Sequence, residues 1–235
     1  MSDALLLLVP IVIAAGAFAQ AVSGMGFSLI AAPALLLALG PHDGVAVCVL
    51  LAALSSIVPL AQERRRVRPR AVASLLLPTL LCTPLVAWLL RDADTTWLAL
   101  GSGVAVVIGV LLLGLGLRSA WFARPEAAAL TGSSSALLNV VGGVGGPPIG
   151  LYVANAGWTA AETRANLHAF FLTQNLVTAL ALGLRLPSWP QLAALAAGTA
   201  LGLALAHRLS AGTVRRVVLA VSLLGGIGLI GGALA

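Results

Sequence analysis

The chain of 235 residues is 60% apolar and only 9% charged, and its mean hydropathy is +1.07. Soluble domains carry about a quarter charged residues because their surface faces water, so this composition argues against a soluble enzyme. It also excludes a disordered chain, which needs low hydrophobicity and high net charge. We therefore predict an integral membrane protein that lies almost entirely within the bilayer.

Apolar runs, most of them near the roughly 20 residues that a helix needs to cross the hydrocarbon core, follow one another along the chain. In the first half they cover 4–40, with a glycine-rich break at 23–26, then 44–61, 71–90 and 96–117. The pattern restarts with 127–157, broken at 142–148, and continues with 165–183, 189–206 and 213–234. The predicted fold is all-α, with a first transmembrane repeat at 1–117, a cytoplasmic linker at 118–125 and a second transmembrane repeat at 126–235.

The two halves resemble each other, since each begins with a glycine-broken double segment and continues with three plain spans. Aligning the breaks places 20–26 over 139–145, an offset of 119 residues that is close to half the chain. Interrupted segments in corresponding positions of two halves are typical of secondary transporters.

The arginines predict the topology, because cytoplasmic connections are enriched in positive charge. With the run at 64–70 in the cytoplasm, eleven of the thirteen arginines fall inside, and only Arg91 and Arg185 fall outside. A broken segment returns to the side it entered, and three spans follow it, so the second half is inverted relative to the first. The sequence thus predicts two inverted repeats, each a glycine-broken helical hairpin plus three transmembrane helices, with both termini outside. Because the arginines lie between spans, no nucleic acid is expected as a partner.

The two glycine-rich breaks are the candidate substrate site. A break frees backbone groups that lipid cannot satisfy, and the helix that resumes presents unpaired N–H donors suited to an anion. Two breaks related by an inverted repeat would meet near the membrane middle and enclose one ligand. The predicted binding residues are Gln20, Ser23, Gly24, Met25, Gly26 and Ser28 in the first half and Asn139, Gly143, Gly145, Gly146, Pro147 and Arg164 in the second.

Glycines outside the breaks have a simpler explanation. Gly198-x-x-x-Gly202 and Gly228-x-x-x-Gly232 have the spacing that allows two membrane helices to approach closely. We expect both pairs to serve helix packing.

His168 is the titratable group that lies inside a predicted span, whereas every carboxylate lies at a span end or in a loop. It follows Arg164 by about one turn on the same helical face. The hypothesis is that His168 couples proton movement to anion movement while Arg164 attracts the anion, with Gln174 and Asn175 lining the pathway. The alternatives are a hydrogen-bonded structural histidine and an arginine that extends to the lipid headgroups.

Cys48 and Cys82 both lie inside apolar runs and form no metal-ligand spacing. We expect small packing residues there, with contact between a thiol and a sulfur substrate as the alternative. No cofactor is expected.

The breaks at 23–28 and 142–148, the near-repeat of 4–117 by 126–235, and Thr163-Arg164-Ala165-Asn166 followed by Phe170-Phe171 resemble the sulfite exporter TauE/SafE family. The resemblance covers essentially the whole chain. It implies a membrane permease for sulfite, sulfonates and related sulfur anions.

The sequence therefore predicts a secondary transporter of a small sulfur-containing anion in the cell membrane, with protons as the candidate coupling ion. A passive anion channel is the main alternative. An intramembrane hydrolase that uses Ser23 and His168 is a weaker one, because the residues around Ser23 form no recognisable nucleophile motif. A homo-oligomer is compatible with all of these features.

Overall fold

The computed structural model describes residues 3–206, 208 and 211–234. This part of the chain forms ten α-helices and two short 3₁₀ helices and contains no strand. The elements are α1 (Asp3–Ser23), α2 (Phe27–Leu39), α3 (Pro41–Glu63), η1 (Arg64–Arg66), α4 (Pro69–Leu90), α5 (Thr95–Leu115), η2 (Ala120–Ala123), α6 (Pro125–Gly142), α7 (Gly146–Asn155), α8 (Ala160–Ala181), α9 (Trp189–Leu205) and α10 (Ala211–Leu234).

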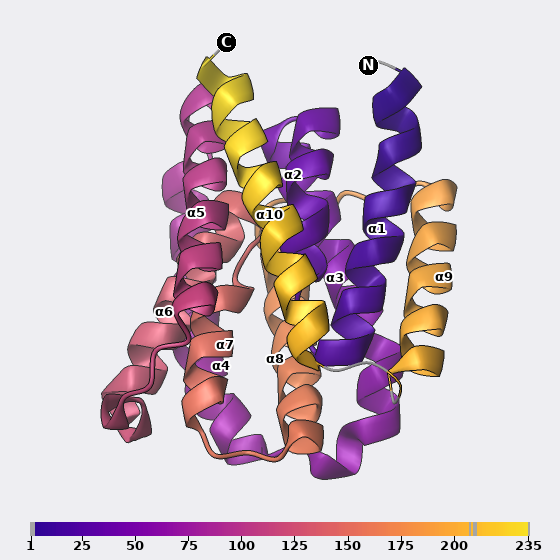
Figure 1. Ribbon diagram of the computed structural model, residues 1–235. Helices are drawn as coiled ribbons and strands as arrows, with labels where there is room; N and C mark the ends of the chain where they lie inside the picture. Colours follow the sequence, from indigo (N-terminus) through magenta and orange to yellow (C-terminus); the bar gives the residue numbers. More distant parts are fainter. Residues whose placement is uncertain (1–2, 207, 209–210, 235) are drawn as a thin grey trace.

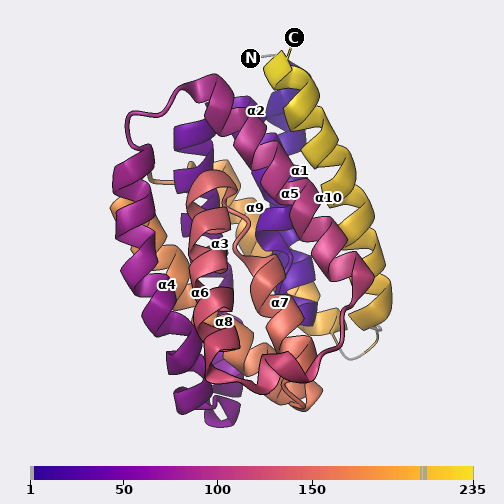
Figure 2. The ribbon, with the colours of Figure 1, turned by 90° about the vertical axis from the view of Figure 1, so that its left-hand side faces the viewer.

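The helices run roughly antiparallel to their chain neighbours and form one bundle (Figure 1). The start of α1 and the end of α10 lie together at one end of the bundle, called the upper end here, and η1 lies at the opposite, lower end. The main helix pairs are α1 with α9, α3 with α8, α4 with α6 and α5 with α10. Figure 2 shows the short hairpin of α6 and α7, which enters the bundle from the lower end.

The bundle is built for an apolar surrounding. Four helices, α3, α4, α5 and α10, are long and apolar enough to cross a membrane, and α1, α2 and α9 are shorter apolar helices. Large apolar side chains are exposed on the outside, including Leu81 and Leu224, which are 75% and 72% exposed. Buried polar side chains are concentrated on α8, which is central and packs on α3. The protein is a multi-pass membrane protein, as predicted.

The two breaks are where the sequence placed them. The first lies between α1 and α2, and the second, between α6 and α7, is shorter than predicted because α7 already begins at Gly146. Helices α2 and α7 have 13 and 10 residues, so they are about 20 and 15 Å long, too short to cross a core of about 30 Å. Each broken segment is therefore a hairpin with a short second arm.

The arginine-bearing connections divide between the ends of the bundle. The connections after α3, α5 and α7 lie at the lower end in Figure 1, whereas those that carry Arg91 and Arg185, after α4 and α8, lie at the upper end. The uneven distribution of arginine along the sequence is therefore also an uneven distribution between the two ends.

The prediction for the first glycine pair is confirmed, and for the second it holds only at Gly232, where an added Cβ would lie 3.6 Å from Leu37 Cδ2. A Cβ at Gly198 would clash with the backbone of Ala14, and one at Gly202 would lie 2.7 Å from Ala21 Cβ. Both glycines therefore allow α1 to pack closely on α9. A Cβ at Gly228 would meet nothing within 4 Å, because Gly228 faces outward on α10. The glycines of α10 that pack closely are Gly225, against Pro33, and Gly226, against Val106.

Gly198→Ala is expected to lower the unfolding temperature of the detergent-solubilised protein. The added methyl must push α1 away from α9, and such overpacking costs about 1–3 kcal/mol. Gly228→Ala is the matched control, because it adds the same methyl to an open helix surface. Equal unfolding temperatures for the two variants, measured by thermal denaturation, would contradict the packing role of Gly198.

Candidate functional site

The first break is a turn that only glycine adopts easily. Gly24 and Gly26 have φ of 83° and 113°, in the left-handed region, and Gly24 N donates to Gln20 O at 2.7 Å. Ser23 Oγ lies 2.8 Å from Ala19 O and 2.7 Å from Met25 O, so its hydroxyl is used within the turn. The turn ends α1 and aims the start of α2 into the bundle.

The second break reverses the chain in a similar way. Gly143 has φ of 70° and donates its N–H to Asn139 O at 2.8 Å, which ends α6. Helix α7 then begins at Gly146 with prolines in its first turn, where the missing N–H costs no hydrogen bond. The start of α7 thus also points into the bundle.

A small cavity of about 20 Å³ lies where the two breaks meet. Its volume holds about one water molecule. Both helix starts reach it, and no carboxylate lines it. The lining residues are Gln20, Gly26, Ser28, Leu29, Asn139, Val144, Gly145, Gly146, Phe171 and Asn175. The structure therefore brings together Gln20, Gly26, Ser28, Asn139, Gly145, Gly146 and Asn175 from the predicted set.

Two buried amides fix the walls of this cavity. Gln20 Nε2 donates to Ala52 O at 3.0 Å and to Ser56 Oγ at 2.7 Å, which ties α1 to α3. Asn139 Nδ2 donates to Asn175 Oδ1 at 3.0 Å and to Thr178 Oγ1 at 2.9 Å, which ties α6 to α8. Buried polar groups are costly unless they are hydrogen-bonded, so these bonds hold both breaks in place.

Gly145 is held by hydrogen bonds to a second layer of polar groups. Its N–H donates to Asn139 Oδ1 at 3.2 Å, and its carbonyl accepts from Ser135 Oγ at 2.6 Å. Gln174 Nε2 donates to Ser135 Oγ at 2.8 Å. Gln174 therefore supports the break, while the neighbouring Asn175 lines the cavity.

Met25 and Ser23 lie on the lower side of the cavity and line a larger space of about 510 Å³, the lower vestibule. Its other walls include Leu113, Gly150 and Trp158. A Cβ at Gly146 would lie 3.8 Å from Met25 Cε, and one at Gly150 would lie 2.5 Å from it. The Met25 side chain thus fills a groove made by two glycines on one face of α7, between the cavity and the lower vestibule.

Three further residues of the predicted site have packing contacts and do not line the cavity. A Cβ at Gly24 would lie 3.1 Å from Arg164 Cα, so this glycine lets the first break approach α8. A Cβ at Gly143 would lie 3.6 Å from Cys48 Sγ. Pro147 packs on α5, where a Cβ at Gly109 would lie 2.5 Å from Pro147 Cγ.

Arg164 lies at the lower end of α8, and its guanidinium forms an ion pair with a carboxylate. Its Nε and Nη2 donate to Glu63 Oε1 at 3.2 and 2.6 Å. A second ion pair, Arg68 with Glu162 at 2.7 Å, joins the same two parts of the chain. In this conformation Arg164 therefore neutralises Glu63 and does not face the cavity.

His168 is fully buried, and neither ring nitrogen has a hydrogen-bond partner among the described residues. No group of the described residues therefore holds its ring by a hydrogen bond. The hydroxyl of Ser23 is used within its own turn, so the serine–histidine pair that a hydrolase needs is not formed.

The two cysteines differ in their distance from the cavity. Cys48 is fully buried on α3, and its thiol is hydrogen-bonded with Ser28, which lines the cavity. Cys82 lies on α4, with Sγ 3.4 Å from Ser133 Oγ. Only Cys48 is adjacent to a residue of the site.

The predicted set missed Leu29, Val144 and Phe171 in the lining and Ser135 and Thr178 behind it. Polar residues in an otherwise apolar run are a signal that could have identified Ser135 and Thr178. Phe171 and the two aliphatic residues carry no such signal, because apolar side chains are common in every span.

Comparison with known proteins agrees with this architecture. No curated protein and no solved structure matches the chain. A family model described as sulfite exporter TauE/SafE matches residues 8–229, nearly the whole chain. That family consists of membrane transporters of sulfur-containing anions. The chain therefore belongs to the sulfite exporter TauE/SafE family.

Proposed function

We propose that the protein is a secondary transporter that moves a small sulfur-containing anion, such as sulfite or a sulfonate, across the cell membrane. The observation that carries this proposal is the cavity lined by both breaks, with Gly26 and Ser28 from one and Gly145 and Gly146 from the other. A site that two hairpins share can open to either end when the hairpins move relative to each other.

The preference for an anion follows from the groups around the cavity. The starts of α2 and α7 both reach it, and the first N–H groups of a helix have no partner within the helix. Helix α2 offers several such groups, whereas in α7 Pro147 and Pro148 leave Gly146 as the donor among the first three residues. The helix dipole adds partial positive charge at the same ends. Ser28 adds a hydroxyl, and with no carboxylate in the lining the balance favours a negative ligand.

The site is built on two inverted repeats in this proposal, and matching contacts support it. Gln20 bonds to Ser56, and Asn139 bonds to Asn175. Both members of the second bond lie 119 residues after those of the first. The contact of α1 with α9 likewise corresponds to that of α6 with α4, and that of α2 with α10 to that of α7 with α5.

Because cytoplasmic connections are enriched in arginine, we place the arginine-rich lower end in the cytoplasm and both termini outside. The membrane is the cell membrane. In the conformation described, the cavity holds about one water and Met25 lies between it and the lower vestibule, so the site is closed on its cytoplasmic side. A sulfur oxyanion enters only when the hairpins separate.

Uptake of radiolabelled sulfite into proteoliposomes tests this function. An imposed pH difference is expected to drive accumulation above the external concentration, since we propose protons as the coupling ion. Flux that only equalises the two concentrations would indicate a passive channel. No movement of sulfite, thiosulfate or sulfonates would contradict the proposed substrate class.

The same assay tests the coupling role that we assign to His168. This role is supported by its full burial, its unpartnered nitrogens and its position one turn after Arg164. His168→Gln is expected to keep downhill sulfite flux and to lose accumulation driven by the pH difference. Unchanged accumulation in a folded His168→Gln protein would exclude His168 as the proton carrier.

A further inference from the structure

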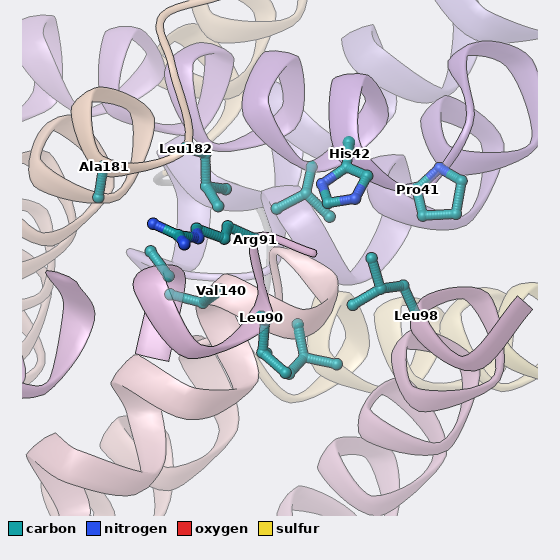
Figure 3. A pocket seen from close by; sticks show the side chains of 11 residues that line it. Pro41, His42, Leu90, Arg91, Leu98, Val140, Ala181 and Leu182 are labelled. Carbon is teal, nitrogen blue, oxygen red and sulfur yellow. The ribbon is translucent and has the colours of Figure 1, made fainter. Parts of the chain in front are cut away.

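A second pocket, of about 130 Å³, opens at the upper end of the bundle (Figure 3). It is formed by the starts of α3 and α5, the ends of α4, α6 and α8, and the residues that follow α4 and α8. Its lining is apolar except for Arg91 and His42. No carboxylate lines it.

The Arg91 side chain lines this pocket and is 62% exposed, and its guanidinium extends between Leu182 and Val140 in Figure 3. Its Nε donates to Asp92 Oδ2 at 2.9 Å, and its guanidinium carbon lies 5.7 Å from the centre of the Trp88 ring. Neither terminal nitrogen has a partner among the described residues. A guanidinium held in this way presents two parallel N–H donors, which suit two oxygens of one oxyanion.

The carboxylates near this pocket are already engaged. Asp92 bonds Arg91, Asp43 pairs with Arg185 at 3.0 Å, and Asp94 accepts from Thr96 N at 2.8 Å. Asp92 therefore compensates the charge of Arg91, and what Arg91 offers to the pocket is its pair of terminal N–H donors. His42 lines the same pocket, on the side away from the end of the Arg91 side chain in Figure 3.

The pocket lies directly next to the residues that hold the central cavity. Val140 in its wall follows Asn139, which lines the cavity, and Leu182 lies one helical turn after Thr178, which accepts from Asn139. An anion in the upper pocket is thus separated from the central site by about one turn of α6 and α8.

We propose that Arg91 and His42 form a recruitment site for small oxyanions at the outer mouth of the transport pathway. The oxyanion binds the terminal nitrogens of Arg91 as a bidentate ligand, and the apolar walls of the pocket offer it no competing carboxylate. This inference rests on the proposed transport function and adds to it a second anion site, distinct from the cavity between the breaks.

The test is the concentration dependence of sulfite uptake in right-side-out and inside-out membrane vesicles. Arg91→Gln is expected to raise KM about fivefold in right-side-out vesicles and to leave the maximal rate and the inside-out KM unchanged. Arg185→Gln is the matched control, since Arg185 lies at the same end, is equally exposed at 62% and also pairs with an aspartate.

Two results would overturn the recruitment site: an unchanged KM for Arg91→Gln, or an equal rise for Arg185→Gln. Both leave sulfite transport by the unmodified protein intact, so they are distinguishable from failure of the proposed function, in which that protein moves no sulfite. A second variant, His42→Gln, is expected to raise KM in the same vesicles, and no change there would remove His42 from the site.

Discussion

Gly146→Ala is expected to reduce sulfite binding and transport at least about tenfold, a loss of about 1.4 kcal/mol. Gly146 lines the cavity between the breaks, and its added methyl would lie 3.7 Å from Phe171 Cζ and 3.8 Å from Met25 Cε. These are ordinary contact distances, so the methyl fits the fold and occupies the space that the anion needs. Binding is measured as the rise in unfolding temperature with added sulfite, and transport as uptake into proteoliposomes.

Gly146 is the better position for this test, because a substitution at its neighbour Gly145 would give an ambiguous result. A Cβ at Gly145 would lie 2.8 Å from Gln174 Nε2 and 2.9 Å from Ser135 O, so a substitution there disturbs the packing before it reaches the ligand. Gly114→Ala is the control, since Gly114 lies on α5 with nothing within 4 Å of the added methyl. If Gly146→Ala binds sulfite as well as Gly114→Ala does, the anion does not bind between the breaks.

The breaks could be predicted from the sequence because they depend on local chemistry. Apolar runs and glycines are visible in a single segment, and Gly24 and Gly143 do adopt the left-handed conformation that ends a helix. The offset between the halves was also visible, and it predicted that Gln20 and Asn139 occupy corresponding positions. Both side chains do line the cavity.

The partners of the charged residues could not be predicted, because they come from distant parts of the chain. Arg164 pairs with Glu63, 101 residues away, and Arg68 pairs with Glu162, 94 residues away. Hydropathy places each of these residues at a span end but contains no information on which ends meet. For the same reason Arg164 was predicted to bind the anion, whereas the structure shows it bound to a carboxylate.

The length of the hairpin arms could not be predicted from the sequence either. The sequence of 127–157 shows the break at 142–148 but not where the second arm ends, and only the structure shows that α7 stops after ten residues. This short arm brings the start of α7 to the cavity and places Gly146 and Gly150 on one face, where they receive Met25. The contact of Met25 with these two glycines is therefore a tertiary feature with no signature in the sequence.

The position that we propose for Met25, between the cavity and the lower vestibule, gives the second prediction with a large effect. Met25→Ala is expected to lower the sulfite accumulation driven by a pH difference several-fold, while downhill efflux of preloaded sulfite rises. The methionine side chain is flexible and fills the groove at Gly146 and Gly150, so its removal joins the cavity to the lower vestibule without a change in the backbone. A transporter keeps a gradient only while one side of its site is closed, and an opening on the side that we propose to be cytoplasmic lets the anion return.

Met25→Leu is the matched control for this variant, because leucine restores most of the lost volume, and volume-conserving apolar exchanges are well tolerated. It is expected to retain accumulation close to that of the unmodified protein. Both proteins are compared by unfolding temperature before reconstitution, so that a loss of fold is separated from a leak. Equal accumulation and equal efflux in Met25→Ala and Met25→Leu would show that Met25 does not close the pathway. The closure on the lower side would then have to lie at the contact of Gly24 with α8, where the first break approaches Arg164 and its partner Glu63.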